Sequence, residues 1–254
     1  MNCYDYPQYW DLAFRDETKY EVAFLKEVIT KYGKGSFNRV MEPGCGGGRM
    51  VVQLAAQGYQ VLAYDVHPPA IRYVQRRLRR RGLQADVFVA DMRSYTARPQ
   101  VDCAMNTVST FRHLLTEQDA VSHLEAMVAS IRKGGLYVLG MHLLPPDADL
   151  EDEESWVARH GSTTVGMHLK VMQTSRRRRL ETLRFEMDVV SGNVRRTFQS
   201  DYVMRIYTAK QIRDLLCKVP EFELLEVYDY GYDIREPQML DNRLGDAVFI
   251  LRRR

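Results

Sequence analysis

Residues 40–49 read VMEPGCGGGR and are followed by MVVQLAAQG up to Gly58. An apolar pair ends in Glu42, glycines follow at positions 44, 46, 47 and 48, and apolar residues then recur at helical spacing. This order predicts a strand, a glycine turn and a helix. Because glycine lacks a Cβ, such a turn is sharp and leaves backbone amides open to a ligand at the start of the helix.

The chain after this turn alternates between short apolar stretches and amphipathic stretches. We expect strands at 59–65, 85–90, 101–105 and 136–143 and helices at 68–81 and 117–131, with Lys133-Gly134-Gly135 as the turn into the last strand. This rhythm is typical of an α/β fold with a doubly wound, mostly parallel sheet, in which ligands bind beyond the carboxyl ends of the strands. Asp65, Asp91, Asn106 and His142 follow those ends, so we expect them to converge on the glycine turn.

The regions on either side of this core, 36–145, have a different character. Residues 1–35 hold an aromatic segment and a helix over 17–32, which predicts an N-terminal lid. Residues 146–206 hold an acidic loop at 147–154 and three stretches of alternating apolar residues, which predict an antiparallel meander inserted after the fifth strand. Its SRRRR run at 175–179 is expected to be a solvated hairpin tip.

Residues 207–254 return to the core. Thr208 is a plausible N-cap for a helix over 208–218, and strands are expected at 222–228 and 246–251. They complete a predicted seven-stranded sheet. The apolar face of the meander is suited equally to covering the pocket and to forming a dimer, so both monomer and homodimer stay open.

Composition excludes several classes of protein. The chain is 45% apolar and 27% charged with a formal net charge of +3, which gives no electrostatic reason to expect nucleic acid. No run of about 18 apolar residues predicts a membrane span. The N-terminus lacks the pattern of a secretory signal, and four cysteines at 3, 45, 103 and 217 have no paired spacing. We expect a cytoplasmic protein without a metal site.

The glycine turn distinguishes between two kinds of ligand. A dinucleotide fingerprint would require glycine at position 49, where the chain has Arg49. The pattern E-x-G-x-G-x-G, from Glu42 to Gly48, instead resembles motif I of the class I S-adenosylmethionine-dependent methyltransferases. The resemblance implies a Rossmann-like methyltransferase fold that binds S-adenosylmethionine.

The same resemblance implies roles for particular residues. Asp65 would bind the ribose hydroxyls, Asp91-Met92 would bind adenine, and the amides of the turn with a cation such as Arg15 would meet the methionine carboxylate. The candidate donor-binding residues are Tyr9, Arg15, Glu42, Gly44, Cys45, Gly46, Gly48, Asp65, Asp91, Met92 and Asn106.

The layout is similar to that of small-molecule methyltransferases related to glycine N-methyltransferase and the aminosugar N-methyltransferases. DNA amino-methyltransferases of this fold carry a Pro-Pro-aromatic signature after the fourth strand, where this chain reads Asn106-Thr107-Val108-Ser109. The expected reaction is methyl transfer to an N or O nucleophile of a small acceptor, mainly by proximity. His142 is the candidate general base and His113 the second, and a structural role stays open for both.

Three alternatives stay open. One is an RNA methyltransferase, which would need a basic groove. Another is a protein that binds S-adenosylmethionine without catalysis. The third is a dinucleotide-dependent oxidoreductase, against which Arg49 counts.

Overall fold

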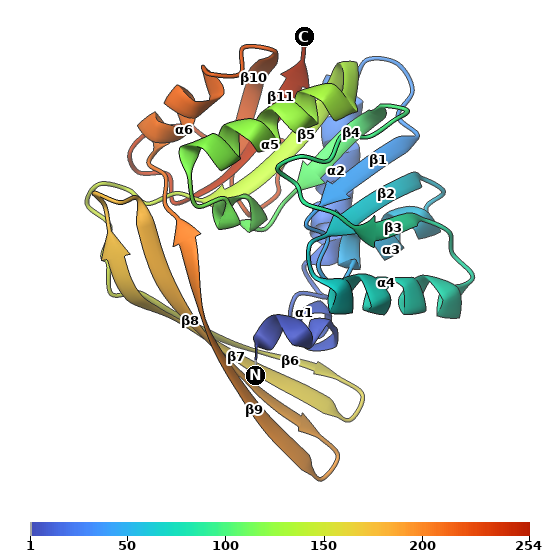
Figure 1. The fold of residues 1–254 in the computed structure, drawn as a ribbon, viewed down its shortest axis with the longest axis vertical. Coiled ribbons are helices and arrows are strands. Elements are labelled where there is room, and N and C mark those ends of the chain that lie inside the picture. Colours follow the sequence, from blue (N-terminus) through green and yellow to red (C-terminus); the bar gives the residue numbers. More distant parts are fainter. Residues whose placement is uncertain (1) are drawn as a thin grey trace.

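The structure, a computed structural model, describes residues 2–254, and its main element is a seven-stranded sheet in the order β10-β11-β5-β4-β1-β2-β3 (Figure 1). The strands are β1 (Arg39–Pro43), β2 (Gln60–Asp65), β3 (Asp86–Val89), β4 (Val101–Asn106), β5 (Ile131–His142), β10 (Phe222–Tyr228) and β11 (Asp246–Arg253). The five strands β1–β5 pair in parallel, whereas β11 is antiparallel to both β5 and β10. The predicted fold class is confirmed.

Helices cover both faces of this sheet. The helices α2 (Thr18–Tyr32), α3 (Arg49–Ala56) and α4 (Pro68–Arg81) pack on one face, and α5 (Glu117–Ser130) and α6 (Ala209–Leu216) pack on the other. Successive side chains of a strand point to opposite faces of the sheet. In β1, Val40 therefore packs with α2, α3 and α4, whereas Met41 packs with α5 and α6. Gly82 ends α4 in the left-handed conformation, and Thr208 begins α6 with a capping box.

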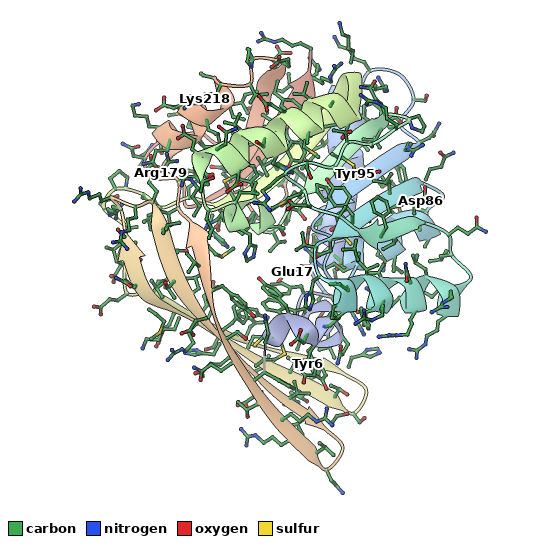
Figure 2. The ribbon with its side chains drawn as sticks, viewed as in Figure 1. Tyr6, Glu17, Asp86, Tyr95, Arg179 and Lys218 are labelled. Carbon is green, nitrogen blue, oxygen red and sulfur yellow. The ribbon has the colours of Figure 1, made fainter. Side chains whose placement is uncertain are left out.

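The meander is a separate sheet with the order β6-β7-β8-β9. Its strands are β6 (Glu153–His160), β7 (Thr163–Ser175), β8 (Leu180–Ser191) and β9 (Val194–Arg205). The N-terminal elements η1 (Cys3–Asp5) and α1 (Pro7–Ala13) lie against its apolar face (Figure 1). Tyr6, labelled in Figure 2, packs with its ring centroid 4.2 Å from that of Phe198 on β9. The chain's own N-terminus therefore covers this face.

Two local expectations were wrong, and a third was wrong at one residue. The meander has four strands, because Glu153 and Glu154, expected in a loop, begin β6. This edge strand pairs with β7, and only Trp156 and Ala158 pack against the apolar cluster, an alternation too short to indicate a strand. β5 begins at Ile131, so Lys133-Gly134-Gly135 lies within it, where the pairing with β4 shifts register. The run at 175–179 forms the predicted hairpin tip between β7 and β8, with residues 176–178 exposed, but Arg179 is mostly buried and pairs with Glu117 at 3.2 Å.

Among residues 2–254, we find no helix with the length and apolar character needed to cross a membrane.

Candidate active site

The glycine turn connects β1 to α3 at the carboxyl edge of the sheet. Gly44, Gly46 and Gly48 all have positive φ, between 49° and 66°, which explains why glycine occupies these positions. The amide of Gly46 donates to Oδ2 of Asp65 at 2.8 Å, and the amide of His67 donates to Oδ1 of the same carboxylate at 2.9 Å. Asp65 therefore braces the turn from the end of β2, with a lone pair left on each oxygen.

Two buried acceptors beside the turn have no hydrogen-bond partner within the described chain. They are Oε2 of Glu42 and Oδ1 of Asn106, and both side chains line the main cavity. Asn106 is held in place because its Nδ2 donates to the Pro43 carbonyl at 3.1 Å. Burial raises the pKa of Glu42 to about 8, with Arg49 opposing the rise. Unpaired acceptors of this kind indicate a site for a ligand that donates hydrogen bonds.

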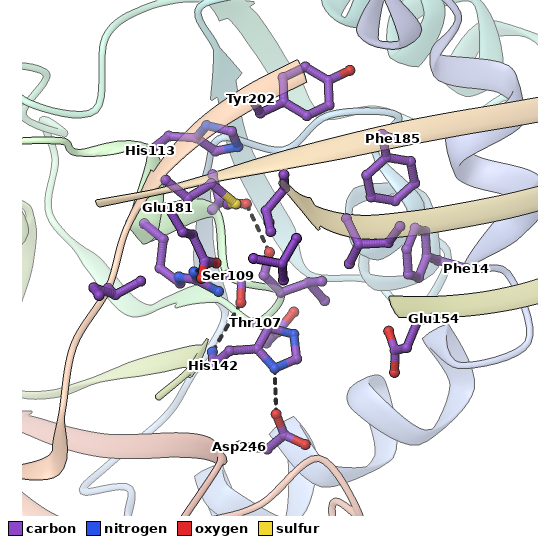
Figure 3. A pocket seen from close by; sticks show the side chains of 18 of the residues that line it. Phe14, Thr107, Ser109, His113, His142, Glu154, Glu181, Phe185, Tyr202 and Asp246 are labelled. Atoms are coloured by element: carbon purple, nitrogen blue, oxygen red, sulfur yellow. Dashed lines mark hydrogen bonds and ion pairs between the residues drawn. The ribbon is translucent and has the colours of Figure 1, made fainter. Parts of the chain in front are cut away.

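The main cavity has a volume of about 650 Å³, which is within the range of small-molecule sites. One part is bounded by the glycine turn and Asn106. The other part lies between η2 (Thr110–His113), the end of β5 and the meander (Figure 3). The cavity therefore joins a turn-side part, which we call the donor chamber, to a meander-side part, which we call the acceptor chamber.

Helix α1 closes the cavity over the glycine turn. Asp11, of which only 3% of the side chain is exposed, pairs with Arg77 of α4 at 2.7 Å and accepts from the hydroxyl of Tyr73 at 3.1 Å. Arg77 also donates to the Gly47 carbonyl at 2.6 Å. A Cβ at Gly47 would lie 3.0 Å from the Pro7 carbonyl oxygen, so the glycine lets α1 approach this closely.

The segment after β4 separates the two chambers. Ser109 has φ 50° and ψ 6°, a left-handed conformation that is unusual for serine and stores backbone strain. Its amide donates to the Gly140 carbonyl at 3.1 Å, and its hydroxyl accepts from the amide of His142 at 3.1 Å. Thr107, in the same segment, donates to the buried Glu21, which also pairs with Arg49. These contacts fix the wall where the chambers meet.

Two polar pairs bound the acceptor chamber, one half-buried and one buried. The hydroxyl of Tyr4 lies 3.0 Å from Nε2 of His113. Burial, reinforced by the charge of Arg112, lowers the pKa of His113, while burial raises the pKa of Tyr4, so the neutral imidazole accepts from the phenol. Arg112 in turn pairs with the buried Glu181 of β8.

His142 lies at the cavity edge at the end of β5. Its Nδ1 is 2.5 Å from Oδ1 of Asp246, the first residue of β11 (Figure 3). The ring also meets Tyr230 edge-on, with 5.1 Å between centroids.

The structure brings some of the predicted donor-site residues together and places others apart. Glu42, Gly44, Cys45, Gly46, Asn106 and His142 line the cavity. Gly48 caps α3 against Val74, and Asp65 lies directly behind Gly46. The remaining four lie outside the lining: Asp91 pairs with Arg93, Met92 packs against the core, Arg15 faces Asp11 at 3.8 Å, and Tyr9 packs near Phe198. Their roles stay predictions.

The predictions did not include Tyr4, Asp11, Glu181 or Asp246 as site residues. Only for Tyr4 and Asp11 did the sequence offer a signal, namely the aromatic segment that predicted a lid. Glu181 and Asp246 reach the cavity through strand pairing far along the chain, for which no local pattern exists.

Comparison with known proteins shows what this chain is similar to. Residues 40–135 match the family model described as "Methyltransferase domain". A curated relative, a putative methyltransferase of Geobacillus sp. (strain WCH70), is 21% identical over 136 residues, covering 53% of this chain and 55% of the relative. The chain thus spans about half the length of this curated relative.

Solved structures extend the likeness over nearly the whole chain. An S-adenosylmethionine-dependent methyltransferase from Clostridium acetobutylicum has a TM-score of 0.80 at 14% identity, with 99% of both chains covered. CalS10, an amino pentose methyltransferase from Micromonospora echinaspora solved with S-adenosylmethionine bound, has a TM-score of 0.72 at 16% identity, covering 97% of this chain and 94% of that one. Residues 40–135 therefore match a methyltransferase domain, and the likeness to these solved structures confirms the predicted Rossmann-like methyltransferase fold.

Proposed function

We propose that this chain transfers a methyl group from S-adenosylmethionine to the amine nitrogen of a small-molecule acceptor. The observation that carries the proposal is that one cavity contains both a donor chamber with unpartnered acceptors and an acceptor chamber with unpaired carboxylates.

The residues of the donor chamber fit the amino-acid end of S-adenosylmethionine. Its ammonium group has three N–H donors, and Glu42 and Asn106 present buried acceptors without partners in the described chain. Its carboxylate suits the backbone amides of the glycine turn. Space is open beside Gly46, because a Cβ there would meet no atom within 4 Å. When bound, S-adenosylmethionine supplies a methyl group that its sulfonium has already activated.

The charge of the acceptor chamber favours a cation. The two arginines that line the cavity, Arg49 and Arg112, are each paired with a buried glutamate. Asp149, Asp152 and Glu154 also line it, and within residues 2–254 none of the three is paired with a cation. A protonated amine complements such a chamber, whereas the phosphates of RNA would be repelled.

The chain's own part in the reaction is to align the acceptor and exclude water. Phe14, Trp10 and Phe185 supply apolar walls, and α1 covers the opening above the glycine turn. Holding two reactants in near-attack geometry contributes on the order of 7–11 kcal/mol to lowering a barrier. The structural likeness to CalS10, an amino pentose methyltransferase, adds support for an amine acceptor.

The test begins with donor binding, measured by calorimetry on the purified chain. We expect micromolar affinity for S-adenosylmethionine, no heat with NAD, and at least tenfold weaker donor binding in Asp65→Ala. Asp86→Ala is the matched control, since Asp86 is an exposed aspartate at the start of β3. Absence of donor binding by the intact chain would overturn the proposal.

The kind of acceptor is then tested with pairs of small molecules in which one carries an amine and the other a hydroxyl. S-adenosylhomocysteine formation is followed with benzylamine against benzyl alcohol and with glucosamine against glucose. We expect product from at least one amine and from neither alcohol. Donor binding without any turnover would favour a non-catalytic binding protein, and turnover of an alcohol alone would contradict the assignment to nitrogen.

A further inference from the structure

His142 and Asp246 are paired across neighbouring strands of the main sheet. They are directly opposite in the antiparallel register of β5 and β11, and Nδ1 of His142 lies 2.5 Å from Oδ1 of Asp246. A carboxylate can only accept, so the bond places the proton on Nδ1 and leaves Nε2 as the basic nitrogen. Nε2 has no hydrogen-bond partner in the described part of the chain, and both side chains line the cavity.

The imidazole is fixed by two further contacts. The backbone amide of His142 donates to the hydroxyl of Ser109, the strained residue between the two chambers. The ring of Tyr230, from the segment between β10 and β11, meets the imidazole edge-on at an interplanar angle of 76°. Burial raises the pKa of Tyr230, so its phenol stays neutral beside the imidazole. On η2 the charged group is Arg112, which is already paired with Glu181.

The second histidine of the cavity is less suited to accept a proton. Nε2 of His113 is occupied by the hydroxyl of Tyr4, and burial lowers the pKa of the ring. In contrast, 48% of the His142 side chain and 44% of the Asp246 side chain are exposed. A proton on the more exposed His142 therefore has a route to solvent.

We propose that Asp246 is a positioning residue that orients His142, and that His142 takes the proton from an ammonium acceptor before methyl transfer. This rests on the proposed function. The unpaired carboxylates attract the amine in its protonated form, but a protonated amine has no lone pair with which to attack the methyl group. A base at the chamber edge resolves this conflict.

The step balances in atoms and charge. The R–NH3⁺ group gives its proton to Nε2 of His142, which leaves R–NH2 and an imidazolium opposite the Asp246 carboxylate. The nitrogen lone pair then forms the N–C bond while the C–S bond breaks, so the positive charge passes from sulfur to R–NH2⁺–CH3. His142 returns its proton to water.

The test compares two amines that differ in protonation at neutral pH. Benzylamine is protonated there and needs the base, whereas aniline is neutral and does not. For Asp246→Asn we expect kcat with benzylamine at pH 7 to fall about 100-fold, in line with general-base contributions. The loss should shrink as the pH approaches 10, and kcat with aniline should change less than threefold.

Controls separate this role from a structural one. Asp241→Asn alters an aspartate of the same segment that pairs with Arg243 outside the cavity, and it should leave both rates unchanged. Asp246→Glu should recover part of the lost rate. Donor affinity, measured by calorimetry, should be the same in all three variants.

Two outcomes would overturn the proposal, and they differ from a failure of the proposed function. One is an equal loss in Asp246→Asn with both amines at every pH. The other is a pH-dependent loss in His113→Asn but none in Asp246→Asn. If the intact chain binds the donor but methylates neither amine, the proposed function fails, and the role of Asp246 fails with it.

Discussion

The hydroxyl of Tyr4 lies 3.0 Å from Nε2 of His113, although 109 residues separate the two in the chain. This bond connects the N-terminal segment to the wall of the acceptor chamber. Tyr4 also stacks on Trp10 at 5.2 Å between centroids, so its ring and its hydroxyl have separable roles. The N-terminal segment thus supplies part of the wall of the acceptor chamber.

Tyr4→Phe should keep the stacking and lose the bond to His113. We expect a loss of about 1 kcal/mol in the free energy of unfolding, because the half-buried imidazole nitrogen loses its hydrogen-bond partner. The acceptor KM should rise about tenfold with donor affinity unchanged. Urea unfolding and steady-state kinetics measure the two effects, with Tyr20→Phe at an exposed site as the control. A change in donor affinity alone would contradict this assignment.

Asp11→Ala should release α1 from the glycine turn. The variant loses the ion pair with Arg77 and the bond from Tyr73, both of which are mostly removed from solvent. We expect the donor to dissociate about tenfold faster, because α1 no longer holds the cavity closed. Stopped-flow measurement of donor release checks this, and limited proteolysis should cut the N-terminal segment sooner. Asp16→Ala, at an exposed position of the same segment, should change neither.

The core fold was predictable because its signals are local. Gly82 at the end of α4 and the capping box of Thr208 each act within a few residues, so the sequence alone places those helix ends. The glycine turn and Asp65 are likewise joined by adjacent strands of one βαβ unit. Such contacts follow from the order of the elements, which the alternating pattern reveals.

The contacts of the acceptor chamber were not predictable, because they join residues that lie far apart in the chain. His142 meets Asp246 across 104 residues, and Arg112 meets Glu181 across 69. Each pairing depends on how the last strand or the meander docks on the core, and no periodicity encodes that. β6 was not predicted because only Trp156 and Ala158 face the apolar cluster, and backbone pairing to β7 holds the remaining residues of the strand.

Glu21→Ala should be the most destabilising change at the site. Glu21 is 1% exposed, and its carboxylate binds Arg49 and the hydroxyl of Thr107. Removing it leaves a mostly buried guanidinium without its partner, which costs about 3–5 kcal/mol in comparable cases. Urea unfolding should show this loss, and Glu27→Ala on the exposed face of α2 should stay within about 0.5 kcal/mol of the parent. Equal stabilities of the two variants would contradict the role of the pair.

Glu42 should make the ligand-free protein less stable as the pH rises. Burial raises its pKa to about 8, with Glu21 and Asp65 adding to the effect and Arg49 opposing it. In the unfolded chain a glutamate has a pKa of about 4.3, so between these values the folded state holds a proton that the unfolded state has released. Stability is therefore fully present below pH 4 and falls until about pH 8, where the folded protein also ionises.

Glu42→Gln should remove this pH dependence, because glutamine is neutral throughout. Relative to the parent, the variant should gain on the order of 3 kcal/mol in free energy of unfolding between pH 5 and pH 8. Urea unfolding at several pH values without donor measures the difference, and Glu27→Gln, exposed on α2, should follow the parent curve. If the parent and Glu42→Gln give parallel curves, Glu42 is already ionised in the folded protein. An ionised Glu42 would then attract the donor's ammonium at every pH, whereas a protonated one would bind it more weakly below pH 8.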